Sequence, residues 1–224
     1  MSTASQLAHE GLPIQSPLPL AALDEGIDRL ALAPSDRVLD VGSGTGELLR
    51  RVVERWPGTT GVGVDLLTAE PVHPAVELRA ADASTVLGER FAAVCCVGSI
   101  HALGGGLDGY RALAELAPVA LVGDGYWRHE PDPRYLDALG ATADELPDRA
   151  GLRSVAAAAG WREAWSVQAT VADLTAYEEA LLANADRHLD REDVVAYATA
   201  IRAWRAAPGG TDTLGFALTL LQRT

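Results

Sequence analysis

Short apolar runs alternate along this chain with longer stretches in which apolar residues recur at helical spacing. The runs of strand length occupy residues 37–41, 61–66, 76–80, 91–98 and 119–122. The stretches with helical spacing cover residues 17–32, 45–56 and 107–116. Strands that alternate with helices in this way predict an α/β fold with a largely parallel sheet.

The second half of the chain extends this pattern. Helices are predicted over 132–140 and 149–159, followed by a sixth strand over 164–170. Two more helical stretches, 173–187 and 191–206, precede a last strand at 213–221. Seven strands with helices between the early ones predict a doubly wound sheet. Residues 1–16 are expected to be loosely held, with His9 and Ile14 as anchors.

Charge and composition narrow the possible partners. The net charge is −13, which repels phosphate backbones and anionic lipids, so we expect small-molecule partners and neither nucleic acid nor membrane. The N-terminal residues have no basic start followed by an apolar core, and we expect a cytoplasmic protein. Cys95 and Cys96 lie in one apolar run and are expected to be buried, while the scattered histidines predict no metal site.

A glycine loop joins the first predicted strand to the next helix. The segment reads Asp40-Val41-Gly42-Ser43-Gly44-Thr45-Gly46-Glu47. Glycine permits positive φ and lets backbone N–H groups approach a ligand that a Cβ atom would exclude. The partly positive N-terminus of the following helix points at the same place. The junction therefore predicts a site for a small cofactor.

The spacing of the glycines distinguishes between cofactors. The dinucleotide pattern Gly-x-Gly-x-x-Gly, counted from Gly42, requires a glycine where Glu47 stands, and a carboxylate there would repel phosphates. A nucleotide triphosphate loop requires a lysine, whereas all 18 basic residues of this chain are arginine. A nicotinamide oxidoreductase is therefore disfavoured but stays an alternative.

The segment from Asp40 to Gly46 resembles motif I of the class I S-adenosylmethionine-dependent methyltransferases. The resemblance implies that Asp40 approaches the amino group of the cofactor. It also implies that the loop lies against the cofactor's carboxylate and ribose, through Gly42, Ser43, Gly44, Thr45 and Gly46. It is specific over residues 36–100 and implies the strand order 3-2-1-4-5-7-6, with the last strand antiparallel.

Two further acids follow at the distances expected of this family. Asp65 lies 19 residues after Gly46 at the end of the second strand, where an acid accepts the ribose hydroxyls. By resemblance, Asp82 after the third strand receives the adenine amino group, although both acids suit any adenine cofactor. The same resemblance assigns four neighbouring residues to the cofactor site: Leu66, Ala83, Gly98 and Ser99.

We expect a single domain over residues 1–224. Its parts are an N-terminal segment with a helix (1–35), a cofactor-binding core (36–123), a variable substrate region (124–212) and a final strand (213–222). The helical stretch 173–206 within the variable region resembles the family's substrate lid.

Ligands of open α/β sheets bind beyond the carboxyl ends of the strands, which places the loop after the fourth strand near the transferred methyl group. Ser99 and His101 are its best-placed polar groups. His101 is our candidate base because imidazole titrates near neutrality. The alternatives are that His101 bonds to the backbone of its own loop, or that no base is needed because sulfonium is a strong leaving group.

The segment after the fifth strand contains Tyr126, Trp127 and Arg128, which are candidates to contact the substrate. Packing is the alternative for the two rings, and an ion pair with Glu130 is the alternative for Arg128. Tyr177 is a further candidate from the lid. We expect methyl transfer to an oxygen, nitrogen or carbon atom of a small molecule. The rivals are the oxidoreductase and a cofactor-binding protein without turnover.

Overall fold

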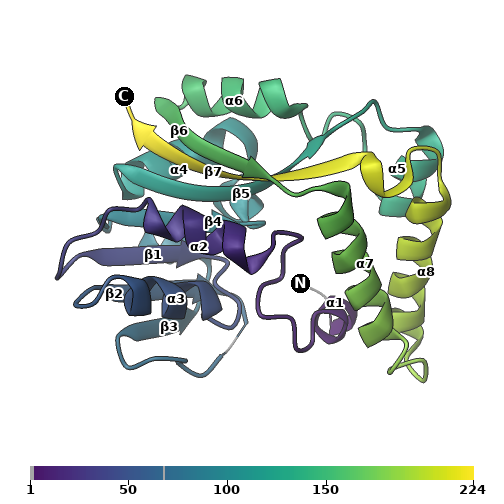
Figure 1. Ribbon diagram of the computed structural model, residues 1–224, viewed down its shortest axis with the longest axis horizontal. Coiled ribbons are helices and arrows are strands. Elements are labelled where there is room, and N and C mark those ends of the chain that lie inside the picture. Colours follow the sequence, from purple (N-terminus) through teal and green to yellow (C-terminus); the bar gives the residue numbers. More distant parts are fainter. Residues whose placement is uncertain (1–2, 68) are drawn as a thin grey trace. The chain divides into compact units, whose positions relative to one another are not determined.

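The computed structural model describes residues 3–67 and 69–224 and contains a seven-stranded sheet (Figure 1). The strand order is β3-β2-β1-β4-β5-β7-β6, as predicted. The strands are β1 (Arg37–Val41), β2 (Thr60–Asp65), β3 (Val76–Ala80), β4 (Ala93–Val97), β5 (Val119–Trp127), β6 (Trp161–Gln168) and β7 (Leu214–Arg223). β1 to β5 pair in parallel, whereas β6 and β7 pair antiparallel.

The chain divides into two compact units that alternate along the sequence. The sheet unit comprises Pro19–Asp124, Ala150–Gln168 and Ala217–Thr224. The helical unit comprises the described residues up to Leu18, together with Gly125–Arg149 and Ala169–Phe216. The organisation of residues 1–224 as one domain stays a prediction.

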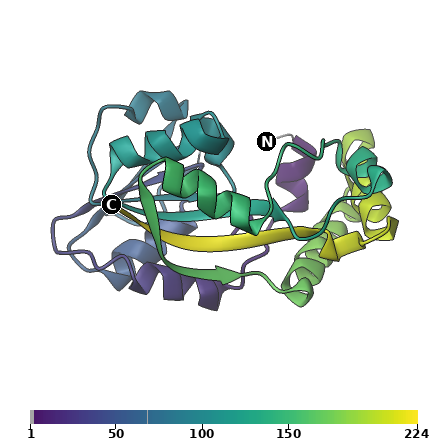
Figure 2. The ribbon, with the colours of Figure 1, turned by 90° about the horizontal axis from the view of Figure 1, so that it is seen from above.

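Helices cover both faces of the sheet unit (Figure 2). On one face lie α2 (Leu20–Asp28) and α3 (Glu47–Arg55), and a Cβ atom placed on Gly26 of α2 would lie 3.0 Å from Leu121. On the other face lie α4 (Gly106–Leu116) and α6 (Arg149–Ala158), whose apolar residues pack with Leu39 and Val94. Burial on both faces explains why the central strands are almost wholly apolar.

Most strand boundaries lie within two residues of the prediction, and two differ by more. β5 continues to Trp127, five residues beyond 122, because Trp127 N–H donates to the Pro147 carbonyl and extends the strand's hydrogen bonding. The polar and glycine residues Asp124 and Gly125 had suggested a loop there. β6 begins at Trp161 instead of 164, and its pairing with β7 shifts register between Glu163 and Trp165.

The helical unit includes α1 (Thr3–Ala8), α5 (Pro133–Leu139), α7 (Val171–Ala185) and α8 (Glu192–Ala206). A capping box formed by Thr170 and Asp173 begins α7. The expectation that residues 1–16 are loosely held was wrong, because α1 buries its alanines against α7 and α8. Met1 and Ser2 lie outside the described residues. Among the helices of the described chain, none has the length and apolar content needed to cross a membrane.

Two glycines of the helical unit give a test of packing. A Cβ atom on Gly215 would lie 2.3 Å from Cζ of the buried Tyr126, whereas one on Gly125 would lie no closer than 3.5 Å to Leu146. We therefore expect Gly215→Ala to lower the free energy of unfolding by about 1–3 kcal/mol. Gly125→Ala is the matched control and should lower it by less than about 1 kcal/mol. Urea unfolding measures both, and equal effects would contradict the packing described.

Candidate functional site

The glycine loop between β1 and α3 has the positive φ angles that its sequence predicts. The values are 73° at Gly42, 52° at Gly44 and 81° at Gly46. Gly42 and Ser43 both donate backbone N–H groups to the Val64 carbonyl, which fixes the loop to the end of β2. Because Gly46 is the left-handed N-cap of α3, the helix begins at Glu47 and not at the predicted position 45.

Close approaches on two sides require glycine. A Cβ atom on Gly42 would lie 2.0 Å from Ser99 Oγ, and one on Gly63 of β2 would lie 2.6 Å from Ser43 Oγ. The loop is thus seated between the end of β2 and the segment that follows β4. In contrast, a Cβ atom on Gly44 would have nothing within 4 Å, so this part of the loop faces open space. Sequence reasoning assigned Gly63 only to a strand. A glycine inside a strand often marks a close backbone approach, and this was the available signal.

Asp65 fixes the loop from the end of β2. Its Oδ2 accepts a hydrogen bond from Gly44 N–H at 2.9 Å, and its Oδ1 accepts one from Leu67 N–H at 2.9 Å. Each carboxylate oxygen keeps a lone pair for a further donor. The neighbouring Leu66 is 73% exposed, which is unusual for a leucine and presents an apolar surface beside this carboxylate.

Asp82 lies after β3, as predicted. It is exposed and caps the short helix η1 (Ala83–Val86) by accepting a hydrogen bond from Ser84 N–H at 2.8 Å. Hydrogen bonds with Ser84 lower the pKa of Asp82, which keeps the group an acceptor at neutral pH. Ala83 is buried in the core of the sheet unit.

Asp40 is the unusual carboxylate of the site. It is 3% exposed, and its neighbours in the sheet are Gly63 and Cys95. Within residues 3–67 and 69–224, no group donates a hydrogen bond to its side chain. Burial, and secondly the charge of Asp65, raise the pKa of Asp40 to about 8. A buried carboxyl without a partner favours a ligand that brings a cation or a hydrogen-bond donor.

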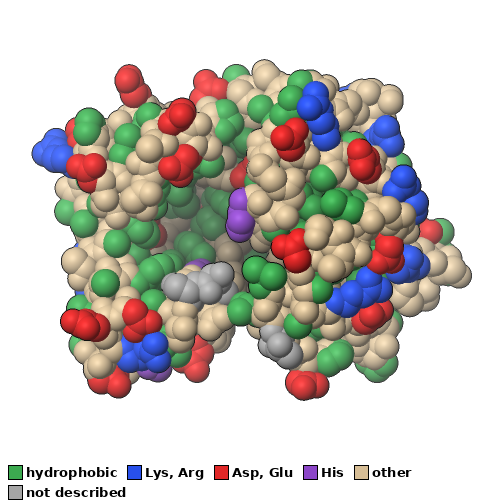
Figure 3. Space-filling model, turned by 180° about the vertical axis from the view of Figure 1, so that it is seen from behind, with side chains coloured by type: hydrophobic (Ala, Val, Ile, Leu, Met, Phe, Trp, Pro, Cys, Tyr) green, Lys and Arg blue, Asp and Glu red, His purple; other side chains and the backbone are tan. Residues whose placement is uncertain are grey.

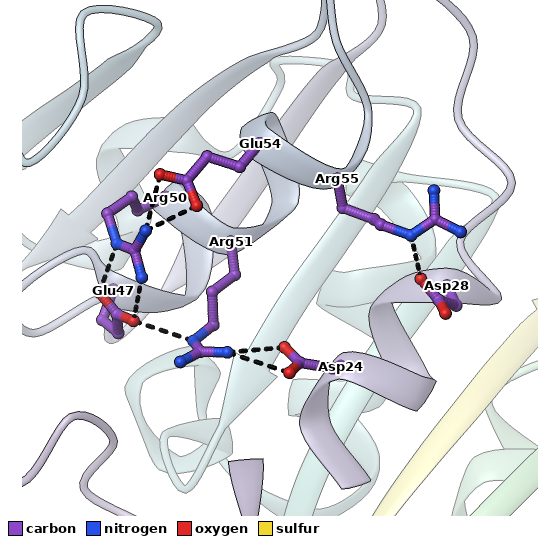
Figure 4. Close-up of polar contacts among 7 residues, drawn as sticks. All are labelled: Asp24, Asp28, Glu47, Arg50, Arg51, Glu54 and Arg55. Carbon is purple, nitrogen blue, oxygen red and sulfur yellow. Dashed lines mark hydrogen bonds and ion pairs between the residues drawn. The ribbon is translucent and has the colours of Figure 1, made fainter. Parts of the chain in front are cut away.

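Glu47 belongs to a network of ion pairs on α3 (Figure 4). Its carboxylate lies 2.6 Å from Arg50 Nη2 and 2.9 Å from Arg51 Nε, and these arginines lower its pKa. Arg51 also reaches Asp24 on α2. The two guanidinium groups balance the charge of Glu47, so its repulsion of a phosphate is weaker than the sequence suggested. What remains against the dinucleotide pattern is the absence of a third glycine.

The segment after β4 brings Gly98, Ser99 and His101 to the same edge of the sheet unit. Gly98 N–H donates to the Gly123 carbonyl of β5, and Ser99 lies against Gly42. His101 lies in the short helix η2 (Ile100–Leu103) and is exposed. Its imidazole makes no hydrogen bond within the described residues. The alternative in which His101 bonds to the backbone of its own loop is therefore wrong for this structure. Its catalytic role stays a prediction.

The four substrate candidates all lie in the helical unit. Tyr126 and Trp127 are buried in β5 and not in a loop, and Trp127 Nε1 donates to the Ala143 carbonyl. Arg128 donates to the Ala169 carbonyl at 2.6 Å and lies 3.7 Å from Asp212, so its partner is not Glu130. Tyr177 is half-buried and hydrogen-bonds to His9. These contacts favour packing for the two rings and leave substrate contact a prediction.

Comparison with known proteins places this geometry among characterised folds. No protein-family profile matches the chain. Over 117 residues it is 35% identical to the uncharacterized protein YjhP of Escherichia coli (strain K12), covering 46% of this chain and 47% of YjhP. The match thus spans about half the length of that curated relative. The solved structure of YjhP has a TM-score of 0.86 at 24% identity and covers 100% of both chains.

Two solved structures named as S-adenosylmethionine-dependent methyltransferases, both in complex with S-adenosylhomocysteine, are similar over the whole chain. The protein from Geobacter sulfurreducens has a TM-score of 0.84, and the protein from Thiobacillus denitrificans has one of 0.81. Each is 23% identical and covers 100% of this chain and 99% of the other. This chain has the methyltransferase fold. The predicted fold class is thereby confirmed, and Asp40, Asp65 and Asp82 lie at or just after the ends of three successive strands.

The raised pKa of Asp40 predicts a pH-dependent stability. The folded protein holds this proton up to about pH 8, whereas the unfolded chain releases it near the ordinary aspartate pKa of 3.8, so stability falls as pH rises between these values. Asp40→Asn removes the buried charge. We expect its free energy of unfolding to exceed that of the wild type at pH 9 by roughly a few kcal/mol, and to match it more closely at pH 5.

Urea unfolding at the two pH values makes this measurement. Asp108→Asn is the control, because the side chain of Asp108 is 80% exposed and should give the wild-type pH dependence. A wild-type pH dependence in Asp40→Asn would contradict the burial of an ionisable Asp40.

Proposed function

We propose that this chain is an S-adenosylmethionine-dependent methyltransferase acting on a small molecule. The observation that carries the proposal is the seating of the glycine loop against Ser99, with Asp65 bonded to the loop. Two residues before Gly42, the buried carboxyl of Asp40 has no hydrogen-bond partner among the described residues. Support also comes from the similarity to two structures that contain S-adenosylhomocysteine.

The chemistry of the cofactor suits these groups one by one. The ammonium group of its methionine part would give the Asp40 carboxyl the positively charged partner that the described residues do not provide. The free lone pairs of Asp65 accept the ribose hydroxyls, and the exposed Asp82 accepts the adenine amino group. Leu66 offers an apolar contact for the adenine ring, and Ser43, Thr45, Ala83 and Gly98 complete the proposed site.

The reaction requires positioning more than acid–base chemistry. A lone pair of the acceptor atom forms a bond to the methyl carbon while the carbon–sulfur bond breaks, and its electrons neutralise the sulfonium. The product is S-adenosylhomocysteine. An acceptor that carries a proton must also lose it, and we propose His101 as the base because its imidazole is exposed and has no competing partner in the described chain.

The charge of the molecule supports a small acceptor and not a nucleic acid. The net charge is −13. On the face drawn in Figure 3, basic side chains lie beside acidic ones, as they do in the network around Glu47. Arginines that are already paired offer little attraction to a phosphate backbone. The acceptor can be an oxygen, nitrogen or carbon nucleophile.

Ligand binding distinguishes this proposal from its rivals. In isothermal titration calorimetry, we expect the chain to bind S-adenosylhomocysteine and not NADH. Gly42→Ala should abolish binding, because the added Cβ would collide with Ser99. Gly88→Ala is the matched control: Gly88 also has a positive φ, but a Cβ atom there would have nothing within 4 Å.

Binding of NADH without S-adenosylhomocysteine would contradict the proposal and favour an oxidoreductase. Binding of S-adenosylhomocysteine without methyl transfer to any component of a metabolite extract would favour a protein that keeps the cofactor without turnover.

Replacement of His101 tests the base. With an acceptor found by such a screen, His101→Ala should lower kcat about 10²–10⁴-fold and leave the affinity for S-adenosylhomocysteine unchanged. His129→Ala is the control, since His129 is also exposed but pairs with Asp212 of the helical unit. Unchanged turnover in His101→Ala would show that positioning alone suffices.

A further inference from the structure

The N-terminal segment of residues 3–12 is bound to helices that follow it by about 160 residues (Figure 1). Ala8 is completely buried against Leu181 of α7 and Ile201 of α8. The Asn184 side chain donates to the Ala8 carbonyl at 2.9 Å and to the Glu10 carbonyl at 2.7 Å. These contacts lie within the helical unit and use polar groups that otherwise have no role in the proposed function.

His9 makes the most specific contact of this segment. It is 8% exposed, and its Nδ1 lies 2.6 Å from the Ser5 carbonyl oxygen. A carbonyl can only accept, so Nδ1 carries the hydrogen. In the neutral ring Nε2 is then an acceptor, and it lies 2.6 Å from the Tyr177 hydroxyl of α7, which donates to it. Both ring nitrogens are thus satisfied when His9 is neutral.

Protonation of His9 disturbs this arrangement. It places a hydrogen on Nε2 as well, and two hydrogens cannot lie between Nε2 and the phenol oxygen. The Tyr177 hydroxyl must then turn its hydrogen away in a largely apolar cluster that includes Leu181 and Ile201. Burial also lowers the pKa of His9, which agrees with a site built for the neutral ring.

We propose that residues 3–12 form a latch on α7 and α8, which neutral His9 holds closed and which protonation of His9 opens. The latch rests on contacts within the helical unit and does not depend on the identity of the cofactor. Its opening would expose the apolar surfaces of Leu181 and Ile201. It would thereby make the stability of α7 and α8 sensitive to acidification.

Other titratable and charged groups surround the latch. Glu10 lies 3.7 Å from Arg187 and 3.5 Å from His188 at the end of α7. Protonation of His188 would strengthen its attraction to Glu10 and so oppose opening. From α8, Tyr197 faces Ser5, and Trp204 Nε1 bonds to the buried Glu178 of α7. His188 is the second imidazole near this segment, so the experiment below includes a variant of it.

Hydrogen–deuterium exchange of the full chain tests the latch. We expect protection of residues 3–12, corrected for the intrinsic pH dependence of exchange, to fall several-fold between pH 7.5 and 4.5 in the wild type. The lower pH is chosen well below the ordinary range of histidine because burial lowers the pKa of His9. In His9→Gln, whose amide oxygen can accept from Tyr177 without titrating, this pH dependence should disappear. Asn184→Ala is the matched control: it should weaken protection at both pH values and keep the wild-type ratio between them.

Three results would overturn the proposal. One is equal protection of the wild-type segment at both pH values, which needs no variant to fold. Another is a wild-type pH dependence in His9→Gln. The third is a pH dependence that persists in His9→Gln but disappears in His188→Gln, which would assign the effect to His188.

Discussion

The close approach of backbone to side chain at the glycine loop is the constraint on which the site depends. Gly42 admits Ser99 from the β4 side, and Gly63 admits Ser43 from the β2 side. A side chain at either position would lift the loop from the end of the sheet. In this position of the loop, Gly44 N–H donates a hydrogen bond to Asp65 and so joins the loop to the carboxylate at the end of β2. The proposed cofactor site thus depends on the absence of a Cβ atom at both glycines.

The buried carboxyl of Asp40 is the counterpart of this constraint. An unpartnered acid in the middle of a parallel sheet is unfavourable for folding, and the protein tolerates it at a strand end beside the loop. Binding sites often contain groups that are unfavourable for folding but suit a ligand, and a buried carboxyl suits a cationic ligand. Glu47 shows the opposite case, since two arginines pair with a carboxylate that the sequence suggested would repel phosphates.

Much of the fold could be predicted because its signals are local. The apolar runs of β1 and β4 each depend on a few neighbouring residues, and so does the glycine spacing. The family resemblance that rests on these signals implied the strand order correctly. The end of β5 could not be predicted, because Asp124 and Gly125 read as a loop while distant backbone partners continue the strand. The same limit applies to residues 3–12, whose partners on α7 and α8 lie far along the chain.

A crystal structure of the chain grown with S-adenosylhomocysteine tests the central claim most directly. The account predicts that the amino group of the ligand lies within hydrogen-bonding reach of the Asp40 carboxyl, with its ribose hydroxyls on Asp65. A ligand bound elsewhere, or a complex with NADH whose diphosphate occupies the loop between Gly42 and Gly46, would contradict it.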